Sequence, residues 1–283
     1  MPGMEAHFRA FSLVDRITRL EAGGRVEGRY HVPEHLAAFP ASLVAEAVGQ
    51  LAAWAAMAVL AFRRRPVAGL AAGIDLLAPV RPGQTLELAA ELESLDEEAV
   101  AYSGVALVNA RPVVRLEHCV GPVLPVEDFD DPAALRQRLA LLQADGARPG
   151  GFDGVPAPDL TGWDGEAGRV RRAMLHVPTE AVFFADHFPR RPVYPGTLLM
   201  HANLEVAAAL TRELPRPVGG QGWTARRVSD VKLRAFTPPG EVLELQAAVE
   251  KLDAQAADTL VETRKGTRVI SRARVRFVPE AGA

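Results

Sequence analysis

Residues 183–196 read Phe-Phe-Ala-Asp-His-Phe-Pro-Arg-Arg-Pro-Val-Tyr-Pro-Gly, and they place one histidine, His187, at a fixed distance before a Pro-Gly pair. The residues that follow Gly196 are mostly apolar, so a buried helix is predicted to begin just after Pro195. Proline is common near a helix start, because its missing N–H would have no partner there. A histidine on the loop that enters such a helix is typical of an active site.

The same stretch resembles the active-site loop of the hot-dog-fold 3-hydroxyacyl-[acyl carrier protein] dehydratases. That pattern reads roughly Phe-Phe-x-Gly-His-Phe-Pro-x-x-Pro-Val-x-Pro-Gly-Val-Leu, and a helix with an acidic residue follows it. The match extends to Leu198. In the family the acid lies six residues after the Pro of Pro-Gly, and here that position is His201. The site is therefore either inactive or completed from elsewhere in the chain.

The composition excludes several classes of protein. A chain of 283 residues that is 48% hydrophobic can form two domains with buried cores. The net charge of −3 and the absence of a polybasic tail argue against a nucleic-acid partner. The single cysteine, Cys119, excludes an intrachain disulfide framework.

Two segments bear on the compartment. Residues 1–10 lack the apolar run of a signal peptide, so a cytoplasmic protein is expected. The longest apolar stretch, residues 37–62, contains Glu46 and Gln50 and is predicted to be a buried helix, not a membrane span. Arg63, Arg64 and Arg65 are expected to end this helix, where cations suit the negative end of its dipole.

The chain also contains an internal repeat. Residues 82–96 parallel residues 239–253 without a gap, and apolar and polar residues alternate in both copies, as in half-buried strands. Strands are predicted to end at His31-Val32-Pro33 and at His176-Val177-Pro178. Each half is therefore predicted to contain a strand, a long apolar helix and then several strands.

We predict two domains. Residues 1–128 form the N-terminal hot-dog domain, residues 129–165 a connecting helix and linker, and residues 166–283 the C-terminal hot-dog domain. Asp131-Pro132 is expected to open a short helix through about Gln143. Between residues 146 and 168 the chain holds seven glycines and three prolines, a composition typical of a surface linker.

The resemblance implies an α+β fold, a double hot-dog. The first central helix has almost no polar face, so a sheet should wrap around it. We expect two curled antiparallel sheets, each wrapping a long central helix, which together form an intrachain pseudo-dimer. Residues 11–17 also resemble the family's opening strand.

Alignment of the two helix starts locates an acid in the other half. Six residues beyond Pro40 is Glu46, in a segment similar to the family's Pro-Gly-x-Leu-x-x-Glu-Ala-x-x-Gln. In the family, each active site combines the histidine of one subunit with the acid of the other. The resemblance therefore implies one complete site, in which His187 meets Glu46.

The mirror-image site is expected to be degenerate. Comparison of the two halves favours loss of the histidine loop between the strand end and the helix start of the first half. The alternative is that His31-Val32-Pro33 is a degenerate copy of the loop's His-Phe-Pro. His35 and His201 are the residues left at this second site. No metal site is predicted, because Pro33 breaks any helix that would align His31 and His35 on one ion.

Dehydration needs a base for the proton on C2 and an acid for the departing 3-hydroxyl. Neutral His187 suits the base, and Glu46, disfavoured as a carboxylate by burial, suits the acid. A backbone N–H at Gly196 is placed to stabilise the thioester oxygen. The residues expected to line the substrate tunnel are Tyr194, Phe188, Pro195 and Gln50, although packing alone would also explain each of them.

The resemblance implies no diffusible cofactor, because phosphopantetheine carries the substrate. The expected partner is acyl carrier protein or a coenzyme A thioester, in fatty-acid, polyketide or polyene biosynthesis. A rim of basic residues near the tunnel mouth would suit such a partner. The same residues are equally compatible with positive charges scattered over the surface. The basic residues are Arg190, Arg191, Arg171, Arg172, Lys232 and Arg234. The protein is expected to be either a monomeric pseudo-dimer or a homodimer of double hot-dogs. An acyl thioesterase and a non-catalytic, carrier-binding partner of an active dehydratase remain alternatives.

Overall fold

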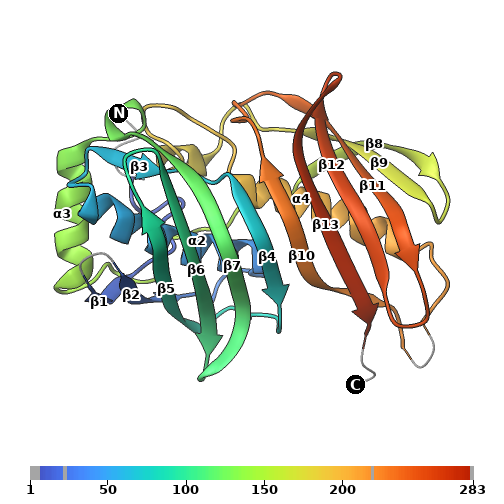
Figure 1. Cartoon of the computed structure of the whole chain (residues 1–283), viewed down its shortest axis with the longest axis horizontal. Helices are drawn as coiled ribbons and strands as arrows, with labels where there is room; N and C mark the ends of the chain where they lie inside the picture. Colours follow the sequence, from blue (N-terminus) through green and yellow to red (C-terminus); the bar gives the residue numbers. More distant parts are fainter. Residues whose placement is uncertain (1–6, 22–23, 218–219, 281–283) are drawn as a thin grey trace.

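A computed structural model describes residues 7–21, 24–217 and 220–280 (Figure 1). The N-terminal half contains β1 (Arg16–Leu20), β2 (Arg25–His31), α2 (Ala41–Val59), β3 (Arg64–Pro66), β4 (Leu70–Leu76), β5 (Thr85–Leu95), β6 (Ala99–Val108), β7 (Arg111–Pro125), the 3-10 helix η1 (Val126–Asp128) and α3 (Pro132–Gln143). The C-terminal half contains β8 (Asp159–Glu166), β9 (Val170–His176), η2 (Val182–Ala185), α4 (Gly196–Thr211), β10 (Trp223–Leu233), β11 (Val242–Leu252), β12 (Ala257–Lys265) and β13 (Arg268–Pro279).

The strands of both halves join into one antiparallel sheet, in the order β1-β2-β5-β6-β7-β4-β10-β13-β12-β11-β9-β8. The connection is the β4–β10 pair, in which Ala71 lies opposite Val231 and Gly73 opposite Ser229. Figure 1 shows these two strands side by side at the centre of the molecule. The prediction of two separate sheets is therefore wrong. If β4 and β10 did not pair, both would be edge strands with unpaired backbone groups.

One long helix lies against each half of the sheet. α2 contacts β5, β6 and β2, and α4 contacts β11, β9 and β12. Both begin immediately after a proline, Pro40 or Pro195, as predicted. α2 is long and apolar enough to span a membrane, but 67% of its apolar window is buried inside the protein. This agrees with the prediction of a core helix.

The repeat in the sequence corresponds to structure. The repeated segments form β5 and β11, each with alternating buried and more exposed residues near its start. The predicted strand ends at His31 and His176 are also confirmed, since β2 and β9 stop there. Alternation of apolar side chains was sufficient to locate these strands because one face of each packs on a helix.

Three sequence predictions need correction. The opening strand begins at Arg16, because the segment at 11–14 bonds to side chains instead of to a neighbouring strand. α2 ends at Val59, and Arg64–Pro66 forms strand β3 against β7. The predicted linker contains β8, an edge strand whose exposed side chains give no hydrophobic alternation. The helix predicted at 132–143 is confirmed as α3, with Asp131 accepting hydrogen bonds from Ala133 N and Ala134 N.

Candidate active site

His187 lies on the loop between η2 and α4. Its ring Nδ1 is 2.8 Å from the carbonyl oxygen of Val193. A carbonyl only accepts hydrogen bonds, so Nδ1 carries the proton and Nε2 is left with a free lone pair. Burial lowers the pKa of His187 below its usual 6.5, although the nearby Glu46 carboxylate opposes this shift. The imidazole is therefore neutral at physiological pH and equipped to accept a proton at Nε2.

Glu46 lies one and a half turns into α2, and two side chains hold its carboxyl group. Thr197 Oγ1, on α4, donates to Glu46 Oε2 at 2.7 Å. Gln50 Nε2, one turn further along α2, donates to Oε1 at 3.0 Å. Thr197 was not anticipated from the sequence, because this bond joins residues of the two halves that are 151 positions apart. The carboxyl group is thus fixed by one donor from each half.

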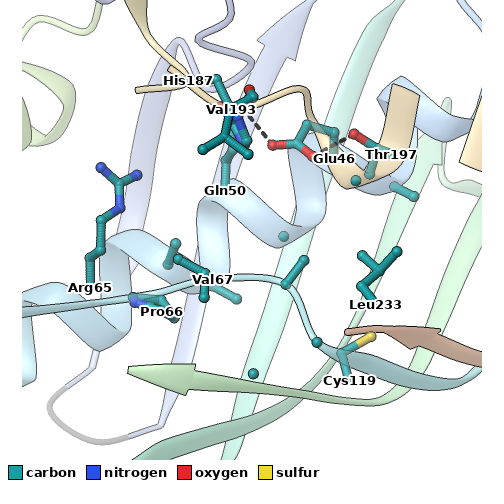
Figure 2. A pocket seen from close by; sticks show the side chains of 18 of the residues that line it. Glu46, Gln50, Arg65, Pro66, Val67, Cys119, His187, Val193, Thr197 and Leu233 are labelled. Carbon is teal, nitrogen blue, oxygen red and sulfur yellow. Dashed lines mark hydrogen bonds between the residues drawn. The ribbon is translucent and has the colours of Figure 1, made fainter. Parts of the chain in front are cut away.

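Both groups line a single cavity of about 240 Å³. Gly196, Tyr194, Phe188 and Gln50 line it too. Figure 2 shows Glu46 reaching from α2 toward Thr197 on one side, with His187 and Val193 above the cavity. Strands β4, β7 and β10 supply the opposite wall, through residues such as Leu70, Cys119 and Leu233. The cavity therefore lies where the two halves meet.

Pro195 does not line the cavity, contrary to expectation. It is the N-cap of α4, and its carbonyl accepts hydrogen bonds from Leu198 N and Leu199 N, each at 3.0 Å. The next residue, Gly196, does line the cavity. The N–H groups of a helix's first turn have no acceptor within the helix and present the positive end of its dipole. This end of α4 is suited to an oxygen that gains negative charge.

Replacing Gly196 with alanine is expected to lower kcat/KM about tenfold, because a Cβ there would come within 2.6 Å of Leu233 Cδ1, displace that side chain and fill the space beside the helix end. Steady-state kinetics on a 3-hydroxyacyl thioester, the substrate class that the sequence resemblance implies, measure this. Gly24→Ala is the matched control, since a Cβ at Gly24 meets no atom within 4 Å. Unchanged kinetics for Gly196→Ala would contradict close approach of substrate to this backbone.

Asp186, next to His187, ties an N-terminal segment to the loop. Its carboxylate accepts hydrogen bonds from the backbone N–H of Phe8, from Phe11 N at 2.7 Å and from Ser12 Oγ at 3.2 Å. Burial raises the pKa of Asp186, and these hydrogen bonds oppose the rise. The related pattern has glycine here, so the departure from the pattern was the available signal for this contact.

The same N-terminal segment continues to Glu46 through Gln50. Gln50 donates to Phe11 O and accepts from Leu13 N, both at 2.8 Å. Phe11 also packs edge-on against the His187 ring, with 5.7 Å between ring centroids. The backbone of residues 8–13 thus bonds both to Asp186, which precedes His187, and to Gln50, which bonds to Glu46, and so it links the two candidate residues.

Asp186→Ala is expected to lower the free energy of unfolding by about 2 kcal/mol, because two buried N–H groups lose their acceptor. Chemical denaturation measures the loss, and amide hydrogen exchange should quicken at Phe8 and Phe11. Asp153→Ala is the control, since the Asp153 side chain is 89% exposed. If Asp186→Ala were as stable as the control, the segment would not depend on this carboxylate.

His35 and His201 do not line the large cavity. The His35 side chain is 54% exposed and lies 3.7 Å from Asp153 Oδ1. His201 is on α4, where burial lowers its pKa and the nearby Glu205 opposes the shift. Among the residues that the structure describes, no group of three or more His, Cys, Asp or Glu residues is arranged to hold a metal ion.

The predicted basic rim is only partly present. Arg171 pairs with Glu213 and Arg172 with Asp164, on β9, which lies four strands away from β10 in the sheet. Lys232 and Arg234 are exposed beside the cavity-lining residues Leu233 and Ala235. Arg191 lies over the rings of Phe236 and Phe129. Arg171 and Arg172 are therefore not part of a basic rim near the cavity.

Comparisons with known proteins agree with the resemblance seen in the sequence. A family model described as ApeI-like, ApeI dehydratase, matches residues 166–271. The 3-hydroxyacyl-[acyl-carrier-protein] dehydratase FabZ of Moorella thermoacetica is 34% identical over 87 residues, which are 31% of this chain and 60% of that protein. FabZ of Herpetosiphon aurantiacus is 34% identical over 70 residues, 25% of this chain and 49% of its own length. The chain thus matches only 49% to 60% of the length of these relatives.

Solved structures show the fold over nearly the whole chain. The dehydratase domain of PpsC from Mycobacterium tuberculosis, in complex with C12:1-CoA, has a TM-score of 0.55 at 15% identity and covers 95% of this chain and 99% of its own. The 12:0-ACP thioesterase from Umbellularia californica has a TM-score of 0.56 at 10% identity, with 90% and 94% covered. The chain has the hot-dog fold, and it is similar to the FabZ and ApeI-like dehydratases.

Proposed function

We propose that this chain dehydrates 3-hydroxyacyl thioesters to trans-2-enoyl thioesters at one composite site, with His187 as base and Glu46 as acid. The observation that carries the proposal is that these two side chains, from different halves, line one cavity beside the start of α4. Similarity to dehydratases over residues 166–271 supports the reaction class. The substrate would be carried on phosphopantetheine, by acyl carrier protein or coenzyme A, and no diffusible cofactor is needed.

The proposed reaction uses each group once. His187 Nε2 takes a proton from C2 of the substrate, and negative charge develops on the thioester oxygen. The Gly196 N–H stabilises that oxygen, a contribution typically worth ~3 kcal/mol. The carboxyl group of Glu46 gives a proton to the 3-hydroxyl, which leaves as water while the C2–C3 double bond forms. The proton on His187 then returns to Glu46 through solvent, and both groups are restored.

The domain arrangement is part of the same proposal. We interpret residues 1–128 and 166–283 as two hot-dog domains that stand in for the two subunits of a dimeric dehydratase, with residues 129–165 connecting them. The contact of Thr197 on α4 with Glu46 on α2 supports this pairing. The protein would then act as a monomeric pseudo-dimer or as a homodimer of double hot-dogs, in cytoplasmic fatty-acid, polyketide or polyene biosynthesis.

An acyl thioesterase is the alternative, with Glu46 activating water, and thioesterases share this fold. One assay separates the two activities. The purified protein is given a 3-hydroxyacyl thioester of pantetheine, and the conjugated enoyl thioester and the released thiol are followed together. We expect enoyl product and no thiol above the uncatalysed rate. Thiol release without enoyl product would overturn the dehydratase proposal, and neither product would favour a non-catalytic role.

A further inference from the structure

Arg65 lies in the cavity wall, and two nitrogen atoms of its guanidinium group donate no hydrogen bond to a described residue. It lies on β3, and its side chain is only 13% exposed. Its Nε and Nη1 atoms are buried and have no hydrogen-bond partner among the described residues. Buried donors without acceptors cost roughly 1–3 kcal/mol each, so a folded protein rarely keeps them without a reason. Arg65 lines the same cavity as His187 and Glu46.

The position of the guanidinium group is set by its neighbours. It lies over the ring of Phe188, with 4.1 Å between Cζ and the ring centroid, in a cation–π contact. Figure 2 shows the side chain extending from β3 toward the His187 loop. Asp130 Oδ2 is 3.8 Å from Nη1, too far for a hydrogen bond. The guanidinium is thus held in place, while the N–H groups of its Nε and Nη1 atoms make no hydrogen bond among the described residues.

The surrounding charges decide what kind of acceptor fits. Burial lowers the pKa of Arg65 to about 10, and the nearby acids Asp130, Glu46 and Asp186 oppose the shift. The group therefore remains a cation at neutral pH, and the Asp130 and Asp186 carboxylates already lie near it. A carboxylate or phosphate brought to Arg65 would also approach these acids. An uncharged oxygen takes the hydrogen bonds without that repulsion.

We propose that Arg65 is a substrate-binding residue that donates hydrogen bonds to an uncharged oxygen of an acyl-phosphopantetheine ligand. Two parts of such a ligand carry this chemistry: an amide carbonyl of the pantetheine arm, and a hydroxyl or keto oxygen on the acyl chain beyond C3. The thioester and 3-hydroxyl oxygens are excluded, because Gly196 and Glu46 take them in the proposed reaction. This inference rests on the proposed function for its ligand class, and it makes Arg65 a determinant of specificity.

The test measures binding, not turnover. The ligands are saturated acyl chains joined to the arm by an amide in place of the thioester, so that neither dehydration nor hydrolysis can occur. The two ligands of the first pair differ in the arm: one has pantetheine, and the other has an alkyl chain of equal length without amides. The two ligands of the second pair differ in the acyl chain: one chain is unsubstituted, and the other carries one hydroxyl group near its far end. Dissociation constants are measured by calorimetry for the wild type and for Arg65→Met, which keeps an unbranched side chain without donors.

Arg65→Met is expected to weaken binding by about 10- to 100-fold for ligands with the recognised oxygen and by less than about threefold for those without it. The pair of ligands that shows the difference identifies the oxygen. Arg65→Lys, which keeps the charge but not the planar fork of donors, should recover part of the loss. Arg64→Met is the matched control, since Arg64 bonds to exposed Glu97 and does not line the cavity.

An equal loss for every ligand, together with a lower melting temperature, would overturn the proposal, because Arg65 would then only hold Phe188 and Asp130 in place. Unchanged binding of every ligand by Arg65→Met, or no binding of any ligand by the wild type, would also overturn it. These outcomes are distinct from failure of the proposed reaction. A protein that discriminates between the ligands but forms no enoyl product would retain the Arg65 subsite and lose the dehydratase assignment.

Discussion

His187→Ala is expected to lower kcat/KM for dehydration by about 10²- to 10⁴-fold, the usual contribution of a positioned general base. The loss should appear in kcat, because the imidazole acts on the proton that moves in the transition state. Enoyl thioester formation, followed by absorbance, measures it. His35→Ala is the control, since His35 is exposed and lies outside the cavity. Activity of His187→Ala at the wild-type level would remove this residue from the mechanism.

The same residue predicts a pH dependence. The base must be neutral, and burial lowers the pKa of His187 below 6.5. The neutral form therefore persists below pH 6.5, and protonation of His187 should lower kcat/KM as the pH drops through this lowered pKa. The acidic limb of the pH profile is expected below pH 6.5 in the wild type and absent from the residual activity of His187→Ala. An acidic limb that begins above pH 6.5 would show that a group other than His187 controls the loss of activity.

Glu46→Gln is expected to lower kcat/KM by a similar factor, about 10²- to 10⁴-fold, because the amide has the shape of the acid but no proton to give. Its oxygen can still accept the hydrogen bond from Thr197, so the contact between the helices should persist, while the amide nitrogen cannot accept the bond from Gln50. Equal melting temperatures for the variant and the wild type would establish that. The control is Glu205→Gln, on α4, which does not line the cavity. Full activity in Glu46→Gln would assign the acid to another group.

Sequence patterns predicted the parts of this fold that depend on local periodicity. β5 and β11 were predicted because apolar residues alternate, and α2 and α4 because a proline precedes an apolar run. The candidate acid was located by comparing the two halves. The segment around Glu46 resembles the family's helix pattern, but no local feature pairs it with a loop far along the chain. Glu46 and His187 do line one cavity, which agrees with that comparison.

Contacts that cross between the halves could not be predicted in the same way. The bond from Thr197 to Glu46 and the three bonds that Asp186 accepts depend on how two distant segments pack, and no periodicity encodes them. Arg65 was expected at a helix end and instead lies on β3, because the helix stops at Val59. β8 was missed since nearly all of its side chains are exposed, so its pairing with β9 leaves no hydrophobic alternation in the sequence.

The central claim is that His187 and Glu46, from two halves of one chain, act on the same substrate in one site. The most direct measurement compares enoyl thioester formation by the wild type, His187→Ala, Glu46→Gln and the double variant. Residues that act as a unit are strongly non-additive, so the double variant should be about as slow as the slower single variant. Losses that multiply in the double variant would mean that the two residues act independently, and that result would contradict a composite site.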